Sequence, residues 1–453
     1  MAPSAVTPPQ QHGDQQRRQD TDLSAAALEL QAEAAAGPDG TAAGEAPLDA
    51  SRLVRTLTLK PRAVPADEAA AHAGDETVAT DHMVTAAWRA DSGWEAPELK
   101  PYGPLQLMPT ASVLHYATEC FEGLKVFRGH DGRLRLFRPD RNAARMRMSA
   151  ARISLPVFDP RELERLIVAL LAVDGPRWLP RDRPGDFLYL RPTLIGTQPQ
   201  LGVQVSRHAL LYVILTYMPR LDEPRGGMRL HTSPGDMVRA WVGGFGYAKL
   251  GANYGPSLLA TQDARRRGFH QILWLYDPAA TVGGGVCVGA GAGAGAGAGD
   301  DDDASADERA ECTEAGASNF FVVWRRPEDG RRELLTAPLD DKLILDGVTR
   351  RSCLDLARER LADDNLVVTE RKYTIAELVR ADAEGRILEA FAAGTAYFIC
   401  PVSQIHHRGH DIHIPIGPGD EPGQVTGKLK RFIGDIMYGR EHHPWGVVIE
   451  ENE

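Results

Sequence analysis

Short runs of β-branched, aromatic and leucine residues recur along this chain without regular alternation with helical segments, and this irregular order constrains the fold most. The runs occupy residues 134–137, 187–196, 209–218, 271–276, 319–324 and 397–400. Each has the length and composition of a buried strand. Helices are predicted after Asp159, Pro256, Thr349 and Thr374, the first of them running through Ala172. Because a doubly wound sheet needs strands and helices in alternation, the order predicts an α+β fold.

Charge and cysteine content exclude several function classes. The chain has 453 residues and a net charge of −11, and more than half of that charge falls within residues 300–311. This balance argues against a nucleic-acid surface. The five cysteines show no paired spacing, so neither a disulfide framework nor a zinc or other metal site is expected. No apolar run is long enough to span a membrane.

Composition divides the chain into four parts. Residues 1–50 are rich in small and polar residues and are predicted to be disordered. Residues 51–218 are expected to form a small α/β domain, 219–228 a linker between domains, and 229–453 a large domain. A Gly/Ala repeat with an acidic run, at about 282–308, is predicted to be a solvated insertion between two hairpin strands. It is either a surface loop of the protein or an intron that was wrongly retained in the coding sequence.

The N-terminal segment gives a weak indication of compartment. It lacks the apolar core of a secretory signal, and the acidic residues Asp14, Asp20 and Asp22 flank the basic pair Arg17 and Arg18. Mitochondrial presequences are poor in acidic residues. The cytosol is therefore the expected compartment, with the mitochondrion as the alternative.

Lys249 is the strongest candidate for chemistry. It lies in the stretch VGGFGYAKLGANYG, with no other charged residue among the eight before it. Removing an amine from water favours its neutral form, which can attack a carbonyl carbon to form a Schiff base. A lysine in a mobile glycine-rich loop would look the same by composition alone.

Three further segments could hold a phosphate-bearing aldehyde cofactor, although each is weak by itself. The Gly-Val-Thr turn at 347–349 precedes a helix, whose N-terminus would present free N–H groups to a phosphate. Thr395 lies in a turn before a strand. Glu314 comes just before an apolar strand, where a buried carboxylate would need a cation such as a pyridinium. The alternatives are an ordinary helix cap, an exposed turn and a glutamate at the rim of a strand.

Taken together, these segments resemble the branched-chain aminotransferases, which are fold-type-IV enzymes dependent on pyridoxal phosphate. The resemblance covers about residues 81–448, and the lysine and glutamate segments are most similar to the fungal members. It rests on the ordered segments HYATECFEGLKVFRG, RMRMSA, FLYLRPTLIGTQPQLGV, VGGFGYAKLGANYGPSL, QILWLYD, TEAGASNFF, LDGVTRRSCLDLA and GTAYFICPVSQI. It implies two domains with the cofactor at their interface.

The resemblance assigns cofactor contacts by position. Lys249 would bind the cofactor as a Schiff base and later move a proton to and from the substrate. Glu314 would keep the pyridine nitrogen protonated, and Tyr254 would hydrogen-bond to the phenolic oxygen. Phosphate contacts are expected from Arg145, Val348, Thr349 and Thr395.

The resemblance also assigns substrate contacts. The amides of Thr395 and Ala396, with Tyr189, would hold the α-carboxylate, and Arg191 would meet the side-chain carboxylate of glutamate. One pocket must then accept both an aliphatic side chain and a carboxylate without leaving a buried charge unpaired. An arginine at the pocket edge can satisfy both requirements if it has other partners when the substrate is apolar.

Aromatic and aliphatic residues are expected to complete the pocket. Phe121 and Tyr116 are candidates for its apolar wall. Leu201 and Val203 would come from the neighbouring subunit, because members of this family are homodimers with pockets at the interface.

The predicted reaction is reversible transamination between leucine, isoleucine or valine and 2-oxoglutarate. Two alternatives stay within the same fold, namely D-amino-acid transamination and a lyase acting on aminodeoxychorismate. The segment RPTLIGTQPQLGV argues against both, because it is expected to form the branched-chain pocket. A third alternative is a binding protein without cofactor, against which the intact set of Lys249, Glu314, Tyr254 and Arg145 argues.

Overall fold

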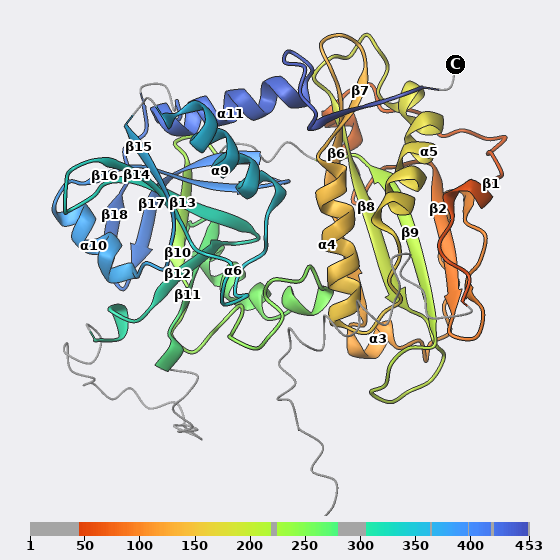
Figure 1. Ribbon diagram of the computed structural model, residues 1–453, viewed down its shortest axis with the longest axis horizontal. Coiled ribbons are helices and arrows are strands. Elements are labelled where there is room, and N and C mark those ends of the chain that lie inside the picture. Colours follow the sequence, from red (N-terminus) through yellow and green to blue (C-terminus); the bar gives the residue numbers. More distant parts are fainter. Residues whose placement is uncertain are drawn as a thin grey trace, which may run out of the picture.

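Two β-sheets lie side by side, each with helices packed against it (Figure 1). The structure is a computed structural model. It describes residues 45–218, 224–279, 305–362, 365–396, 398–417 and 421–451.

The first sheet has ten strands, and all its pairings except β1 with β4 are antiparallel. Along its main path the order is β1-β4-β2-β9-β8-β6-β7-β19, while β3 pairs with β2 and β5 with β8. The strands are β1 (Val54–Arg55), β2 (Ala79–Arg89), β3 (Gly93–Trp94), β4 (Glu98–Pro101), β5 (Glu119–Phe121), β6 (Leu124–Arg128), β7 (Leu134–Phe137), β8 (Phe187–Gly196), β9 (His208–Thr216) and β19 (Gly446–Ile449).

Two long helices cover this sheet, and α4 lies on the side that faces the second sheet (Figure 1). Their apolar faces, with Met146 of α4 and Leu166 of α5 fully buried, share one core with the strands. The helical segments of this half are η1 (Ala50–Arg52), α2 (Glu68–Ala71), α3 (Val113–Tyr116), α4 (Pro139–Arg152) and α5 (Pro160–Trp178).

The second sheet closes on itself. Strand β12 pairs with both β11 and β13, so the pairings form a ring in the order β12, β11, β10, β17, β16, β13. Strands β14, β15 and β18 extend it. The strands are β10 (Met228–Thr232), β11 (Gln271–Tyr276), β12 (Glu311–Ala315), β13 (Ser318–Arg325), β14 (Arg332–Thr336), β15 (Leu366–Glu370), β16 (Ile387–Gly394), β17 (Phe398–His407) and β18 (His410–His413).

Both faces of the second sheet pack against an apolar core. Successive side chains along a strand point to opposite faces, so one strand contributes to both cores. In β13, Phe320 and Val322 pack in one core with α10, whereas Phe321 and Val323 pack in another with α9 and α11. The helical segments of this half are η2 (Gly251–Asn253), α6 (Ser257–Arg266), α9 (Val348–Arg360), α10 (Ile375–Ala383) and α11 (Gln424–Met437).

The α+β prediction is confirmed, and several element boundaries agree with the sequence. The helix predicted after Thr374 is α10, and Thr374 and Glu377 form a capping box at its start. Helix α5 begins as predicted, with the Asp159 carboxylate accepting from the Arg161 amide, but it extends beyond Ala172 to Trp178. Its last turn is held by tertiary contacts, because Asp174 and Trp178 are buried against β2.

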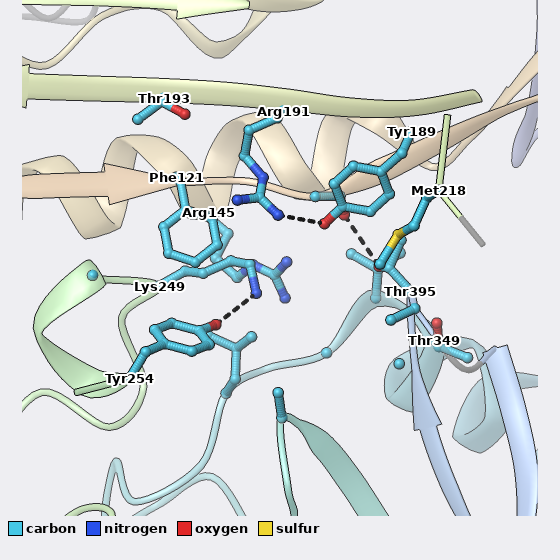
Figure 2. A pocket seen from close by; sticks show the side chains of 18 of the residues that line it. Phe121, Arg145, Tyr189, Arg191, Thr193, Met218, Lys249, Tyr254, Thr349 and Thr395 are labelled. Carbon is cyan, nitrogen blue, oxygen red and sulfur yellow. Dashed lines mark hydrogen bonds between the residues drawn. The ribbon is translucent and has the colours of Figure 1, made fainter. Parts of the chain in front are cut away.

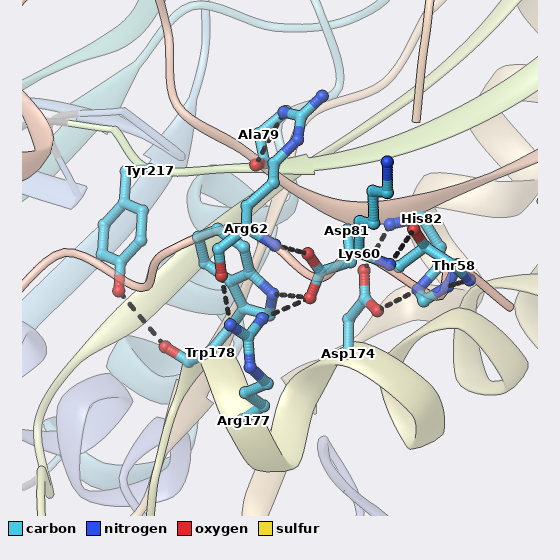
Figure 3. A network of polar contacts seen from close by, with 10 residues as sticks. All are labelled: Thr58, Lys60, Arg62, Ala79, Asp81, His82, Asp174, Arg177, Trp178 and Tyr217. Carbon is cyan, nitrogen blue, oxygen red and sulfur yellow. Dashed lines mark hydrogen bonds and ion pairs between the residues drawn. The ribbon is translucent and has the colours of Figure 1, made fainter. Parts of the chain in front are cut away.

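Figure 3 shows the polar network that fixes this turn and the N-terminal segment. The Asp174 carboxylate contacts Nδ1 of His82 at 2.6 Å, and Nε2 of His82 accepts from the Thr58 amide at 2.9 Å. The Asp81 carboxylate accepts from Trp178 Nε1 at 2.8 Å. The segment before β2 is therefore linked to α5 through side chains of β2 and α5.

Both ends of the described chain differ from the sequence-based division. Residues 45–50 are ordered, since Leu48 is buried in the first core and the Trp94 amide donates to the Ala46 carbonyl. Strand β19 pairs with β7, so the final strand lies in the first sheet although 229–453 was assigned to the second half. Sequence alone missed this return, because Val447 and Val448 would fit the edge of either sheet.

Two predicted segments fall largely outside the described residues. The linker at 219–228 is described only from residue 224, and the insertion at about 282–308 only from residue 305. Where the insertion rejoins the fold, the Asp307 carboxylate contacts Nε2 of His407 at 3.0 Å. No helix in the described ranges combines the length and apolarity needed to cross a membrane.

Candidate active site

A cavity of about 660 Å³ lies between the two sheets. The first sheet and α4 line one side, and the segment 249–254, β12, the N-terminus of α9 and the end of β16 line the other. Figure 2 shows side chains from both halves converging on this space. Residues far apart in sequence are thus brought to one site.

Strand pairing explains the floor of the cavity. Phe121 of β5 lies opposite Thr193 of β8, which lies opposite Tyr212 of β9. Arg191 and Glu119 are two residues from these positions, so their side chains project from the same face of the sheet. All five line the cavity.

Lys249 is held in place by its backbone. Its amide donates to the Ser149 hydroxyl of α4 at 2.9 Å, and its carbonyl accepts from the Phe121 amide at 3.1 Å. The side-chain amine Nζ donates to the Tyr254 hydroxyl at 3.3 Å and lies 5.1 Å from the centre of the Phe121 ring. The chain around Lys249 is therefore docked on the first half while the amine points into the cavity (Figure 2).

Arg145 is fixed by a buried carboxylate. Its Nε and one terminal nitrogen donate to the two oxygens of Glu122 at 2.7 and 2.8 Å, and its other terminal nitrogen donates to the Asp346 carbonyl at 2.8 Å. Burial alone would raise the pKa of Glu122, but the charge and hydrogen bonds of Arg145 hold it below its ordinary value. This geometry leaves further N–H groups of the guanidinium for the cavity.

Glu314 is buried on the opposite side. Its Oε1 accepts from Asn319 Nδ2 and from the Leu345 amide, both at 3.2 Å. Its Oε2 lies 2.7 Å from an Arg239 nitrogen, but the angles are not those of a hydrogen bond, and this oxygen accepts none from the described residues. Burial raises the pKa of Glu314, although Arg239 opposes the shift.

The N-terminus of α9 opens on the cavity. Gly347 precedes the helix without a side-chain cap, and Val348 and Thr349 form its first turn beside the cavity. A Cβ at Gly347 would collide with the Asn319 amide oxygen. Only glycine allows this close approach, and the free N–H groups of the turn with the helix dipole favour an anion there.

The turn at 394–396 is attached to the first half of the chain. The Thr395 hydroxyl donates to the Gly123 carbonyl at 3.1 Å, and Lys125 Nζ donates to the Ala396 carbonyl at 3.3 Å. A Cβ at Gly123 would overlap the Tyr189 hydroxyl, so Tyr189 stands close to this turn.

Arg191 lies against aromatic rings. Its guanidinium carbon is 4.6 Å from the centre of the Phe121 ring and 5.2 Å from that of Tyr189. One terminal nitrogen donates to the Tyr189 hydroxyl at 3.2 Å, while the buried Nε has no hydrogen-bond acceptor in the described chain. Stacking on aromatic rings stabilises a guanidinium that has no carboxylate bound to it.

The structure brings together most of the residues chosen from the sequence. The following line the cavity: Phe121, Arg145, Tyr189, Arg191, Lys249, Tyr254, Glu314, Val348, Thr349, Thr395 and Ala396.

Tyr116, Leu201 and Val203 do not line the cavity of their own chain. Tyr116 was expected in the apolar wall, and it lies outside the wall that its own chain forms. Ala117 adopts a left-handed conformation that ends α3, and the Tyr116 hydroxyl accepts from the Gly202 amide at 2.9 Å. Leu201 and Val203 are 56% and 92% exposed, so all three residues lie along one outer edge.

Sequence reasoning missed the partners of the charged site residues, namely Glu122, Arg239, Asn319 and Glu119. Glu122 could have been noticed as a lone acid in the apolar run CFEGLKVF. Arg239 carries no such signal, since 75 residues separate it from Glu314. Within the described ranges, no group of three or more histidine, cysteine, aspartate or glutamate side chains could hold a metal ion.

Comparison with known proteins places the chain in a family. The profile of "Amino-transferase class IV" matches residues 119–286 and 291–405. The chain is 40% identical over 408 residues to the cytosolic branched-chain-amino-acid aminotransferase of Saccharomyces cerevisiae, covering 90% of this chain and 99% of the relative. It is 42% identical over 370 residues to the mitochondrial enzyme of Schizosaccharomyces pombe, covering 81% and 78%. The mouse cytosolic enzyme is 42% identical over 373 residues, covering 81% and 86%.

Solved structures agree on the fold. The branched-chain aminotransferase of Thermoproteus uzoniensis, crystallised with norvaline, superposes with a TM-score of 0.57 at 23% identity, covering 81% of this chain and 99% of that one. The enzyme of Thermobaculum terrenum in its PLP form gives 0.57 at 21% identity, covering 82% and 98%. The resemblance seen in the sequence is thereby confirmed, and the chain belongs to the branched-chain-amino-acid aminotransferases, a group of class IV transaminases.

Proposed function

We propose that this chain binds pyridoxal phosphate in the cavity and transfers an amino group reversibly between leucine, isoleucine or valine and 2-oxoglutarate. The observation that carries the proposal is the convergence of three features on one space. They are the amine of Lys249, the buried Glu314 carboxylate, and the N-terminus of α9 beside Arg145.

The residues present fit this cofactor. The Glu314 Oε2 is a buried acceptor without a hydrogen-bond donor among the described residues, and a protonated pyridine nitrogen is a donor that would suit it. The N–H groups of Val348 and Thr349, with the Thr395 hydroxyl and Arg145, would bind the phosphate. The pocket therefore offers an acceptor for the ring nitrogen and donors for the phosphate.

Lys249 would act as the covalent anchor and the proton carrier. Pyridoxal phosphate supplies an electron sink that stabilises negative charge at the substrate α-carbon. The Lys249 amine lies 3.3 Å from the Tyr254 hydroxyl, which would fix its direction and bind the phenolic oxygen. Once released, the same amine would take the proton from the α-carbon and deliver it to C4′ of the cofactor, on the other side of the shared nitrogen.

The turn at 394–396 would orient the substrate. The amides of Thr395 and Ala396, with the Tyr189 hydroxyl, would hold the α-carboxylate. Contacts of this turn with Gly123 and Lys125 fix its position before a substrate arrives. A preformed donor set lowers the entropy cost of orientation.

Arg191 would accommodate both classes of side chain. With glutamate or 2-oxoglutarate its guanidinium would pair with the second carboxylate. With leucine it would remain stacked on Phe121 and Tyr189, where it is found in this structure. Phe121 would also contribute to the apolar wall.

We also propose a homodimer in which Leu201 and Val203 close the partner's cavity, with Tyr116 on the same edge. Their exposure leaves apolar surface that a second subunit would cover. Replacing both Leu201 and Val203 with serine should raise the KM for leucine severalfold and weaken the dimer, as measured by analytical ultracentrifugation. A variant that kept a wild-type KM and dimer affinity would contradict this assignment.

The cytosol is the compartment we propose. Support comes from the acidic residues at 14, 20 and 22, which flank the basic pair at 17 and 18. The two Saccharomyces relatives are named as a cytosolic and a mitochondrial form. Subcellular fractionation of the native protein is the test, and enrichment with mitochondrial markers would overturn the proposal.

Absorbance of the purified protein tests the main proposal. A cofactor band near the edge of the visible range should bleach when L-leucine is added and return with 2-oxoglutarate. D-Alanine serves as the control, because it should leave the band unchanged. Absence of a band after reconstitution with pyridoxal phosphate would refute the enzymatic proposal.

A further inference from the structure

Glu119 is an acid on the cavity floor to which the reaction above gives no role. It lies in β5 two residues before Phe121, projects from the same face of the sheet and is half-buried. A Cβ at Gly251 would overlap the Glu119 carboxylate, so this side chain reaches the turn that follows Lys249. It therefore lies within the cavity wall and not at the rim.

The electrostatic partner of Glu119 is Arg191. Burial raises the pKa of Glu119, and the nearby guanidinium of Arg191 opposes the shift. Burial likewise raises the pKa of Tyr212, which lies beside Thr193 and is affected in opposite directions by Glu119 and Arg191. No hydrogen bond or ion pair joins Glu119 to Arg191 in the described structure, so the two charges interact through space.

The other charged and titratable groups near Glu119 are accounted for. Tyr212 faces it from β9 and Arg191 from β8. Cys120 is the next residue in β5, is fully buried and points to the opposite face. The Lys249 amine lies 5.1 Å from the centre of the Phe121 ring, and the turn at 251–253 carries no charge. Among the described residues, Arg191 is thus the one cation that shifts the pKa of Glu119.

Charge balance differs between the two kinds of substrate. With an aliphatic side chain in the cavity, Arg191 has no carboxylate from the substrate. With glutamate or 2-oxoglutarate, a second carboxylate would join Glu119 beside a single guanidinium, and two carboxylates sharing one site repel each other. A fixed carboxylate would therefore favour one class of substrate over the other.

We propose that Glu119 determines this specificity by changing its protonation state with the substrate. Its ionised carboxylate balances Arg191 when the substrate is aliphatic, and it takes one proton from solvent when the substrate brings a second carboxylate. The inference rests on the proposed function, since it requires both substrate classes to use this cavity.

Kinetics as a function of pH provide the first test. For the holoenzyme, we compare kcat/KM for 2-oxoglutarate with kcat/KM for 4-methyl-2-oxopentanoate, so that titrations common to both cancel. The value for 2-oxoglutarate divided by the value for 4-methyl-2-oxopentanoate should fall as the pH rises from about 5 to about 8. The fall should be at most roughly tenfold per pH unit, because Glu119 takes up one proton when 2-oxoglutarate binds.

The variant Glu119→Gln should hold this ratio constant at the low-pH value of the wild type, because glutamine resembles the protonated carboxyl in shape and charge. At pH 8 the variant should thus favour 2-oxoglutarate over the aliphatic acid by about five- to tenfold more than the wild type does. Glu98→Gln is the matched control, since Glu98 is an exposed strand carboxylate paired with a lysine. It should retain the pH dependence.

Calorimetry of the wild-type holoenzyme gives a second measurement that needs no variant. Binding of glutarate in two buffers of different ionisation enthalpy should show proton uptake, whereas binding of 4-methylpentanoate should show none. An equal uptake for both ligands would overturn the inference. So would a ratio that still falls with pH in Glu119→Gln. If the protein transfers no amino group between leucine and 2-oxoglutarate, the proposed function itself fails, which is a separate outcome.

Discussion

The charged groups at one end of the cavity have fixed hydrogen-bond partners, whereas those at the other end do not. At the end proposed to bind the cofactor, Arg145 and Glu122 are joined by two hydrogen bonds, and Glu314 accepts from Asn319 and from a backbone amide. At the end proposed to bind the substrate, Arg191 stacks on aromatic rings and its Nε has no hydrogen-bond acceptor among the described residues. No hydrogen bond or ion pair joins it to Glu119 in the described structure.

The difference follows from what each end must bind. A cofactor presents the same groups in every catalytic cycle. Charged residues with fixed partners can therefore position it precisely without limiting which ligands bind. The substrate pocket must accept an aliphatic chain and a carboxylate in turn, so its charged groups need partners that can be exchanged. Four predictions test this contrast, from the largest effect to the smallest.

Loss of the cofactor anchor should have the largest effect. Lys249→Ala should lower kcat by roughly 10⁴-fold or more, because it removes both the covalent link and the proton carrier. The far-UV circular dichroism should stay unchanged, since the backbone of residue 249 makes the structural contacts. Lys100→Ala, at an exposed lysine, is the control and should retain wild-type kcat. Retained turnover in Lys249→Ala would remove the lysine from the mechanism.

Breaking the buried pair at the cofactor end should cost stability. Glu122→Gln leaves the Arg145 guanidinium buried without its counter-charge and should lower the free energy of unfolding by about 3 kcal/mol. Urea denaturation with and without pyridoxal phosphate measures this, and cofactor affinity should fall as well. The control is Glu333→Gln, at a buried carboxylate of β14 that accepts from Trp324 Nε1 and lies outside the cavity lining. If that variant lost as much cofactor affinity, Glu122 would have no special connection with Arg145.

Changing the substrate end should alter selectivity and spare the fold. Arg191→Met should lower kcat/KM for glutamate by about 30- to 100-fold, because the side-chain carboxylate loses its charged donor. The value for leucine should change only a fewfold. A parallel loss for both amino acids would mean that Arg191 supports the pocket as a whole and does not read the second carboxylate.

The pH dependence of stability should have opposite signs at the two ends. The pKa of Glu122 is lowered from 4.5, so its contribution is present above about pH 4.5 and is lost as pH falls through the lower value. The pKa of Glu119 is raised from 4.5, so stability decreases as pH rises above that value. The cost of Glu122→Gln should therefore shrink on acidification, whereas any gain from Glu119→Gln, below about 1 kcal/mol, should grow with pH. Urea midpoints between about pH 3 and pH 7 compare the two slopes, and equal slopes would contradict the contrast.

The same contrast separates what sequence could predict from what it could not. Residues proposed to face the cofactor, such as Lys249 and Thr349, lie in local motifs whose composition already indicates chemistry. Their partners come from distant segments, and a single sequence does not tell that Arg239 meets Glu314. Sequence also did not show that Tyr116 lies outside the cavity of its own chain, because no residue before Ala117 indicates the left-handed conformation that ends α3. Each strand predicted from a short, continuous apolar run overlaps a strand of the structure, whereas β2 was missed because its first half carries the polar residues Thr80, Asp81 and His82.

The return of β19 to the first sheet has a mechanical consequence. The two halves are joined once between β9 and β10 and a second time where α11 leads into β19 (Figure 1). Two separate chain connections restrict rotation of one half relative to the other more than a single connection would. The gap between the sheets should therefore hold a nearly constant width through the cycle. Exchange of amino and oxo acids would then depend on movements of side chains and short turns at the open edge.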